Sequence, residues 1–177
     1  MTPLIRAERP EDFPAIRAVV TAAFGKASEA DLVEAIRASA GYLSDYSLVA
    51  EEDGEVVGHV MLSHSSLVDG DDVRTVLSLA PLAVAPALHG QGVGGSLVRE
   101  ATRLADAARE PLVILEGSPL YYPRFGFVDS RTIGITFPSL PEWAPPEAGQ
   151  ALPLAAYSPA YRGEVRYPPA FDAAIET

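Results

Sequence analysis

Apolar and polar residues alternate along the chain at two spacings, which predict a mixture of helices and strands. Apolar residues recur at helical spacing through RPEDFPAIRAVVTAAFG, residues 9–25, with Gly25 as the expected end of the helix. A second helix is expected from Ser28, which together with Asp31 resembles a capping box. The first part of the chain therefore predicts two consecutive helices before any long strand.

Runs of alternating and β-branched residues then predict a series of strands. The run Leu112–Glu116 follows a strand–helix unit, so it should lie parallel to the strand that ends at Val84. A short helical segment around Pro119–Arg124 should lead to a final core strand near Phe127. The other expected strands are Thr2–Arg6, Ser47–Glu52, Val56–Val68, Val73–Val84 and an edge strand at Gly163–Tyr167.

The stretch Leu79–Gly95, LAPLAVAPALHGQGVGG, is typical of a strand that enters a glycine turn and opens a helix. A helix from Gly92 or Gly94 to about Ala108 would present unpaired N–H groups to an anion such as a phosphate. Pro81 lies inside the strand pattern and cannot donate to a sheet ladder, so a break or bulge is expected nearby. The stretch therefore predicts a phosphate-binding turn.

Two other phosphate motifs fit this stretch less well. Gly90, Gly92 and Gly95 satisfy the dinucleotide pattern G-x-G-x-x-G, but Ala85–His89 separate the strand from the first glycine. A P-loop would need Lys followed by Ser or Thr after the glycines, and this sequence has neither there. A dinucleotide enzyme remains an alternative, and it predicts binding of NAD.

Two sequence blocks together resemble the GNAT superfamily of acyl-CoA-dependent N-acetyltransferases, and most closely its small YhbS-type bacterial branch. The run His89–Gly94 resembles the family pattern Arg/Gln-x-x-Gly-x-Gly/Ala, with His89 at the position of the usual Arg or Gln. The block EGSPLYYPRFGF, Glu116–Phe127, resembles the family's later tyrosine-to-Gly-Phe motif, with Tyr122 on a fixed position. The resemblance covers about Thr2–Asp129.

This resemblance implies an α/β fold, with a mixed, mostly antiparallel sheet, a splayed parallel strand pair and helices on both faces. It also implies transfer of an acetyl group from acetyl-CoA, as co-substrate, to a primary amine of a small molecule or peptide by direct attack. The coenzyme-binding residues that it implies are Leu82, Ala83, Val84, His89, Gly90, Gln91, Gly92, Val93, Gly94, Gly95 and Ser96.

The resemblance implies catalytic roles for two residues of the second block. Tyr122 would act as a general acid that protonates the departing thiolate, although it could also be a packing tyrosine beside Tyr121. Glu116 could remove a proton from the amine through water, or could be a structural carboxylate. His89, which is mostly neutral near pH 7, keeps open a second function: a non-catalytic acyl-CoA-binding sensor or interaction module of the same fold.

Length and composition bound the remaining possibilities. The 177 residues fit one domain, with a core over residues 2–129 and an extension over 130–177 that packs on it and holds 8 of the 16 prolines. A net charge of −11 argues against nucleic acid and anionic membranes, and is compatible with a cationic partner or with solubility alone. The chain contains no cysteine, which excludes disulfides and thiol chemistry.

His59 and His64 lie five residues apart on one expected strand, so they should face opposite sides and not share a metal ion. The first residues lack an apolar signal core, and no apolar run approaches the length of a membrane span. We therefore expect a cytoplasmic protein without a membrane segment or a metal site. The sequence leaves a homodimer open.

Overall fold

The computed structural model describes residues 2–174, which fold into two units that each combine separate stretches of sequence. Of the described residues, the first unit comprises 2–63, 80–104 and 169–174, and the second comprises 64–79 and 105–168. Strands pair along the path β1-β2-β3-β4-β5-β8-β6, and β9 pairs with β3 and β7. The prediction of one domain over residues 1–177 stays a prediction.

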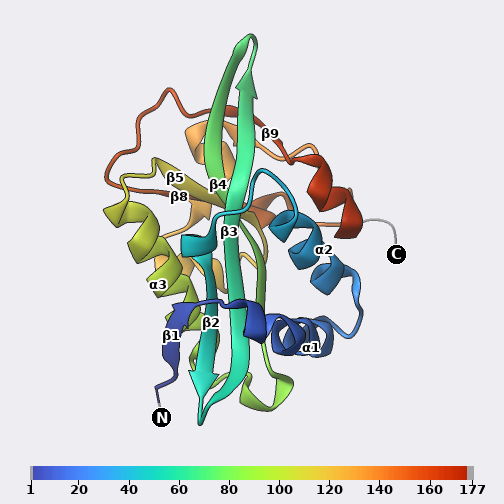
Figure 1. The fold of residues 1–177 in the computed structure, drawn as a ribbon. Helices are drawn as coiled ribbons and strands as arrows, with labels where there is room; N and C mark the ends of the chain where they lie inside the picture. The colour runs from blue at the N-terminus through green and yellow to red at the C-terminus, as the bar shows by residue number, and fades with distance from the viewer. Residues whose placement is uncertain (1, 175–177) are drawn as a thin grey trace. The chain divides into compact units, whose positions relative to one another are not determined.

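In the first unit, β1 (Leu4–Ala7) pairs antiparallel with β2 (Ser47–Glu52), which pairs antiparallel with β3 (Glu55–Asp69). Helices α1 (Phe13–Phe24) and α2 (Ser28–Arg37) pack on one face of these strands (Figure 1). Their buried residues form one apolar core with residues of β2 and β3. That core contains Ile16, Val20, Ala30, Leu32, Val33, Ile36, Val49 and Met61.

Helix α3 (Val93–Ala107) covers the opposite face of β3. A Cβ atom at Gly58 would lie 2.9 Å from the Leu97 side chain and 3.2 Å from Val93, so α3 sits directly against this glycine. Successive strand residues point to opposite faces, and Met61 is three residues after Gly58. Met61 therefore points to the face opposite α3, where it packs in the α1–α2 core. The expected arrangement of helices on both faces is therefore confirmed.

In the second unit, Leu77 and Ser78 of β4 (Asp72–Val84) pair parallel with Val113 and Ile114 of β5 (Leu112–Glu116). Strand β8 (Gly149–Pro153) then pairs antiparallel with β5 and with β6 (Val128–Asp129). The predicted parallel relation of these two strands is confirmed. It follows from the α3 crossover between them, because a strand–helix–strand connection returns in the same direction.

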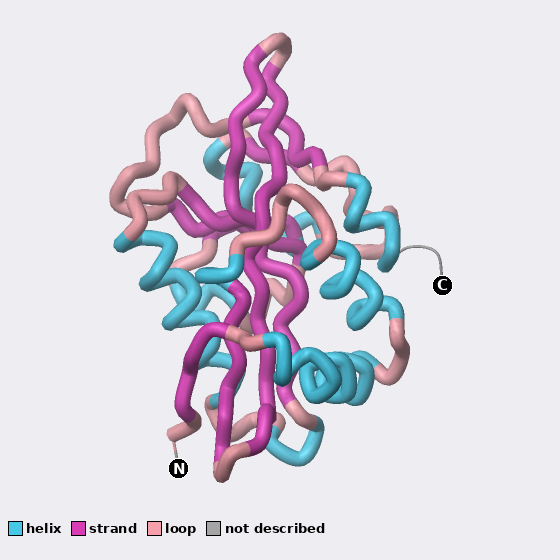
Figure 2. The backbone as a smooth tube through the Cα atoms, in the orientation of Figure 1, coloured by secondary structure: helices cyan, strands magenta, loops and turns pink. Residues whose placement is uncertain are grey.

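The chain after β5 contains more pairing than the sequence predicted, although much of it is loop (Figure 2). Strand β9 (Gly163–Arg166) pairs antiparallel with β3 and parallel with β7 (Ile135–Thr136). The predicted edge strand at Gly163–Tyr167 is therefore wrong in one respect: it has neighbours on both sides. The strand near Phe127 is also not the last, because pairing among residues far apart in sequence creates further short strands.

Local details of the first elements also differ from the predictions. Strand β1 is shifted from the expected Thr2–Arg6 to Leu4–Ala7. The capping box is wrong, because Ala27 is the N-cap residue and the buried Ser28 hydroxyl has no hydrogen-bond partner among residues 2–174. Short 3-10 helices lie at Pro10–Asp12, Ser44–Tyr46, Pro86–Leu88, Tyr122–Phe125, Ser130–Ile133, Pro146–Ala148 and Pro169–Ala174.

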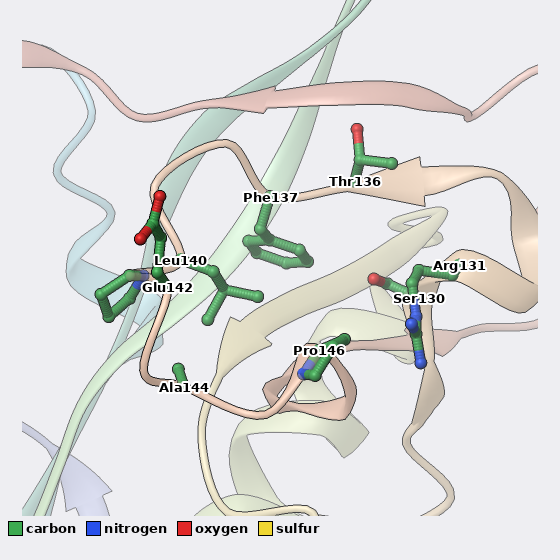
Figure 3. A pocket seen from close by; sticks show the side chains of 9 residues that line it. Ser130, Arg131, Thr136, Phe137, Leu140, Glu142, Ala144 and Pro146 are labelled. Atoms are coloured by element: carbon green, nitrogen blue, oxygen red, sulfur yellow. The ribbon is translucent and has the colours of Figure 1, made fainter.

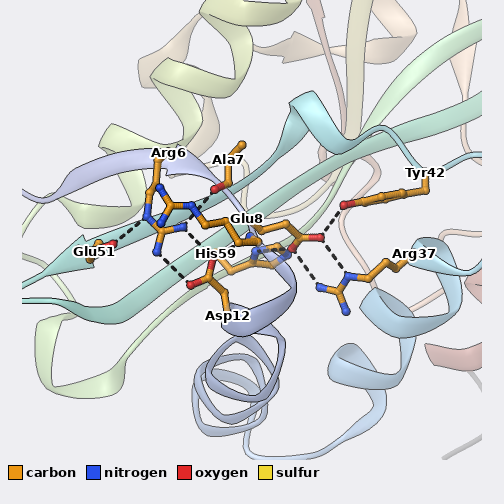
Figure 4. A network of polar contacts seen from close by, with 9 residues as sticks. Arg6, Ala7, Glu8, Asp12, Arg37, Tyr42, Glu51 and His59 are labelled. Atoms are coloured by element: carbon orange, nitrogen blue, oxygen red, sulfur yellow. Dashed lines mark hydrogen bonds and ion pairs between the residues drawn. The ribbon is translucent and has the colours of Figure 1, made fainter.

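A buried polar network joins the start of the chain to α2 and β3 (Figure 4). The Glu8 carboxylate accepts hydrogen bonds from Arg37 (3.0 Å from Nε and from Nη2) and from the Tyr42 hydroxyl (2.8 Å). His59 is fully buried, and its Nδ1 lies 3.9 Å from Oε2 of Glu8. Burial lowers the pKa of His59 to about 4, so this histidine is neutral at pH 7.

Within the described part of the chain, none of the helices has the length and hydropathy needed to cross a membrane.

Candidate active site

The glycine turn lies in the first unit, between the end of β4 and the start of α3. Strand β4 continues through Pro81 to Val84, and the Ala85 N–H then donates to the carbonyl of Val57 at 2.8 Å. The strand is therefore not broken at Pro81, although its pairing with β5 ends at Ser78 and the Ala80–Pro81 peptide bond is cis. A bulge near Pro81 stays a prediction. Helix α3 begins at Val93, which confirms the helix start expected between Gly92 and Gly94.

The backbone of this turn explains the glycines. Gly90 and Gly92 have φ angles of +77° and +89°, in the left-handed region that residues with a Cβ rarely adopt. A Cβ at either position would meet nothing within 4 Å, so conformation and not crowding requires glycine there. The first N–H groups of α3, from Val93 onward, lack carbonyl partners within the helix and stand at its positive end. This backbone suits a phosphate group.

Two side chains of the turn bind its own backbone. The Nε2 of His89 lies 2.8 Å from the carbonyl oxygen of Val84, so the protonated nitrogen donates to it. The Nε2 of Gln91 donates to the carbonyl of Ala87 at 3.1 Å. Both side chains are exposed, and both hold the turn in shape. In this conformation, anion binding falls to the backbone N–H groups.

The end of β4 presents residues of alternating burial before the turn. Ala83 is buried and its carbonyl lies beneath Gly58, whereas Leu82 and Val84 are half-buried. All the residues predicted to bind the coenzyme, from Leu82 to Ser96, therefore lie on one continuous segment of the first unit.

The two predicted catalytic residues lie in the second unit, at opposite faces of the end of β5. A Cβ at Gly117 would lie 2.5 Å from the ring of Tyr122 and 3.2 Å from the Leu115 side chain. The Tyr122 ring is therefore on the face to which Leu115 points. Glu116 points to the other face, because side chains alternate along a strand. A proton acceptor and a proton donor can thus act from the two sides of this strand end.

Aromatic packing fixes the Tyr122 ring. It makes edge-on contacts with Tyr121, Phe125 and Phe127, at ring-centre distances of 5.0, 6.5 and 5.7 Å. Burial raises the pKa of the Tyr122 phenol, and the neighbouring Tyr121 raises it further. The hydroxyl has no hydrogen-bond partner among the residues that the structure describes. Tyr122 is therefore protonated at neutral pH, with its proton uncommitted.

Hydroxyl groups from the later part of the chain hold Glu116. The Ser139 hydroxyl donates to its Oε2 at 2.9 Å, and the partly buried Tyr167 side chain also hydrogen-bonds to it. Burial raises the pKa of Tyr167 well above its ordinary range, and the charge and hydrogen bond of Glu116 add to this effect. Sequence patterns alone did not identify Ser139 or Tyr167, because each reaches Glu116 only through the fold.

Gln150 is a further residue that sequence reasoning missed. It is buried in β8, and its Nε2 donates to the carbonyls of Gly117 and Ser118 at 3.1 and 3.2 Å. Those carbonyls belong to the turn that carries the chain from β5 to Tyr122. Gln150 thereby fixes the path between the two candidate catalytic residues.

The β4–β5 parallel pair, the glycine turn that opens α3 and the tyrosine after β5 together define the fold of an acyl-CoA-dependent N-acetyltransferase. The sequence profile of the acetyltransferase (GNAT) domain matches residues 44–129. The N-acetyltransferase YhbS of Escherichia coli K12 is 36% identical over 124 residues, which are 70% of this chain and 72% of YhbS. The chain therefore belongs to the GNAT family, and it is an acyl-CoA-dependent N-acetyltransferase.

Other relatives agree with this assignment. The N-acetyltransferase YjhQ of E. coli K12 is 38% identical over 112 residues, which are 63% of this chain and 62% of YjhQ. The crystal structure of E. coli YhbS in complex with CoA has a TM-score of 0.84 at 30% identity, and covers 97% of this chain and 93% of that chain. A GNAT acetyltransferase of Brucella melitensis in complex with acetyl-CoA has a TM-score of 0.75 at 35% identity, with coverages of 96% and 97%.

Proposed function

We propose that the protein transfers the acetyl group of acetyl-CoA to a primary amine of a small molecule or peptide by direct attack. The observation that carries this proposal is the placement of Tyr122 and Glu116 on opposite faces of the end of β5. The complexes of YhbS with CoA and of the B. melitensis relative with acetyl-CoA support acetyl-CoA as the co-substrate. The acidic chain, with a net charge of −11, is compatible with a cationic acceptor.

The segment from Leu82 to Ser96 holds the coenzyme in this proposal. The N–H groups that follow Gly90 and Gly92 bind the pyrophosphate at the positive end of α3. The backbone of Leu82–Val84 aligns the pantetheine arm, and an N–H there polarises the thioester carbonyl. Bound acetyl-CoA supplies the activated acyl group.

Glu116 and Tyr122 carry the two proton transfers. Glu116 accepts, through water, the proton that the ammonium form of the acceptor must lose before its nitrogen can attack. The new C–N bond forms as the C–S bond breaks, and Tyr122 donates its proton to the departing thiolate. The acylated nitrogen then loses its extra proton, which returns through water to the Tyr122 phenolate, so the product is a neutral amide. The raised pKa of Tyr122 keeps this proton in place until charge develops on sulfur.

An acceptor screen tests this function. A panel of amines and peptides is incubated with acetyl-CoA, and release of the free CoA thiol is followed. We expect thiol release that depends on the acceptor for at least one class of amine. Calorimetric binding of acetyl-CoA without thiol release across the panel would contradict catalysis.

A non-catalytic acyl-CoA sensor is the second candidate function. The observation that favours it is His89, which replaces the usual Arg or Gln and is bonded to the carbonyl of Val84. A histidine held in this way has its Nε2 directed at the backbone of its own turn and not at a pyrophosphate. The same calorimetric and thiol-release measurements separate the two functions.

A further inference from the structure

A cavity of about 310 Å³ lies in the second unit, away from the glycine turn in sequence. Its walls come from the 3-10 helix Ser130–Ile133, strand β7 and the loop of residues 137–146 (Figure 3). These residues follow the segment 44–129 that matches the family profile. The cavity has the size of a small-molecule site, near the lower end of the usual range of about 300–1,000 Å³.

The inner wall of the cavity is apolar with one hydroxyl. The side chains of Phe137, Leu140 and Pro146 surround the space, and the Ser130 hydroxyl points into it (Figure 3). Ser130 is only 1% exposed, so its hydroxyl is a polar group in an otherwise apolar inner wall. A ligand group that bonds to this hydroxyl would be held at the inner end of the cavity.

The rim of the cavity is acidic. The Arg131 guanidinium is paired with Asp129, at 3.0 and 2.6 Å, and with Glu147 at 3.4 Å. Its charge is therefore already balanced. Glu142 lies on the rim, exposed and without an ion-pair partner among the residues that the structure describes. An apolar space with an excess of carboxylates at its mouth fits a ligand with an apolar body and a positive charge.

The cavity lies on the same face of the sheet as the candidate base. Leu112 and Ile114 alternate with Glu116 along β5, and both pack in one core with Phe137, a wall residue of the cavity. The loop that lines the cavity also bonds directly to the base, because the Ser139 hydroxyl donates to Glu116 at 2.9 Å. A ligand in the cavity is thus linked to Glu116 through a single loop.

We propose that this cavity is the acceptor subsite, and that it selects primary amines that carry an aromatic or branched apolar group. The apolar group packs against Phe137, Leu140 and Pro146, while the Glu142 carboxylate attracts the ammonium form. The term acceptor subsite rests on the proposed acetyl transfer, but binding of an amine in the cavity can be measured without catalysis.

The first experiment uses the fluorescence of Trp143, the only tryptophan of the chain. Trp143 is 86% exposed and lies between the lining residues Glu142 and Ala144, so occupancy of the cavity should change its emission. The full chain is titrated with 2-phenylethylamine, with its neutral analogue 2-phenylethanol, and with ethanolamine. We expect saturable binding of 2-phenylethylamine, weaker binding of 2-phenylethanol and none of ethanolamine. Indistinguishable responses to the three compounds would overturn the proposal.

Two substitutions test the site directly. Ala144→Phe fills the cavity from its rim and should weaken 2-phenylethylamine binding roughly tenfold, because it removes the space for one buried ring. The same change at the exposed Ala155, which is outside the cavity lining, serves as the control. Glu142→Gln should weaken the amine roughly twofold to fivefold and leave 2-phenylethanol unchanged. The control for charge is Glu55→Gln, at an exposed turn of the first unit.

The outcomes separate this inference from the proposed function. If thiol release occurs with polar amines while Ala144→Phe leaves kcat/KM for 2-phenylethylamine unchanged, the acetyl transfer stands and the subsite is wrong. If Trp143 reports saturable binding that Ala144→Phe abolishes, the cavity is a binding site even where no amine is acetylated. If binding is seen but no amine is acetylated, the proposed acetyl transfer is wrong, while the cavity still selects its ligand as proposed.

Discussion

At the scale of single residues, the proposed mechanism divides the proton chemistry between Tyr122 and Glu116, on the two faces of one strand. Tyr122 is enclosed by aromatic rings and keeps its proton, whereas Glu116 is bonded to Ser139 and Tyr167. Burial raises the pKa of the Tyr122 phenol, which favours the protonated form that its proposed role requires. The roles therefore follow from surroundings that differ across a distance of a few residues.

Removal of the Tyr122 hydroxyl should slow acetyl transfer without loss of coenzyme binding. For Tyr122→Phe we expect kcat to fall roughly 100-fold or more, because general acid catalysis contributes about 10²–10⁴-fold. The KM for acetyl-CoA should stay within about twofold of the parent value, since the ring and its packing are kept. Steady-state thiol release measures both constants. Tyr121→Phe removes the neighbouring hydroxyl as a control, and equal turnover by parent and Tyr122→Phe would remove Tyr122 from the mechanism.

Tyr167 should act through Glu116 and not independently of it. We expect Tyr167→Phe to lower kcat about tenfold, because a hydrogen bond to a charged group contributes about 1.5–3 kcal/mol. In a Glu116→Gln background the same substitution should have little further effect, and a double-mutant cycle of kcat measures this coupling. Tyr157→Phe, which packs on the same core, is the control. Additive losses would mean that Tyr167 only supports packing.

At the scale of elements, the turn between β4 and α3 is the feature that local sequence specified best. The turn needs residues that adopt positive φ, and Gly90 and Gly92 provide them. The helix after it was predictable from its apolar stripe and from the glycines that precede it. The pairing of β9 with both β3 and β7 was not predictable, because it depends on the return of a long, proline-rich segment to the sheet.

The conformation of Gly92 should control coenzyme affinity. Its φ of +89° disfavours any residue with a Cβ by about 1–2 kcal/mol, so Gly92→Ala should weaken acetyl-CoA binding roughly tenfold. Gly54→Ala is the matched control, because Gly54 also has a positive φ, of +83°, but lies in the turn between β2 and β3. Isothermal titration calorimetry with acetyl-CoA measures both variants. The same affinity for Gly92→Ala and Gly54→Ala would show that the left-handed turn is not needed for binding.

At the scale of the whole molecule, a buried polar network contributes to how stability depends on pH. Burial alone would raise the pKa of Glu8, but hydrogen bonds from Arg37 and Tyr42 lower it below its ordinary value. Glu8 therefore contributes stability that is lost only as pH falls below about 4.5. His59 affects stability at a higher pH, because its pKa is about 6.5 in the unfolded chain and about 4 in the folded protein. Between these two values only the unfolded chain binds the proton.

The free energy of unfolding should therefore fall as pH drops through the range in which only unfolded His59 is protonated. Between about pH 7 and about pH 5 this group alone should cost about 2 kcal/mol, given its folded pKa of about 4. The difference in urea unfolding between the parent and His59→Gln isolates this contribution. His64→Gln is the control, since His64 is half-buried on the same strand. A parent and a His59→Gln variant with the same pH dependence would contradict the prediction.

The sequence by itself determined the features that depend on near neighbours. The order of helices and strands, the glycine turn at Gly90–Gly92 and the position of Tyr122 after β5 all follow from periodicity and turn chemistry over a few residues. Only the tertiary structure decided which groups surround Glu116, because Ser139 follows it by 23 residues and Tyr167 lies farther still. Hydrogen bonds across such separations, like the cavity formed by residues 130–146, depend on strand register and loop closure, which local patterns do not encode.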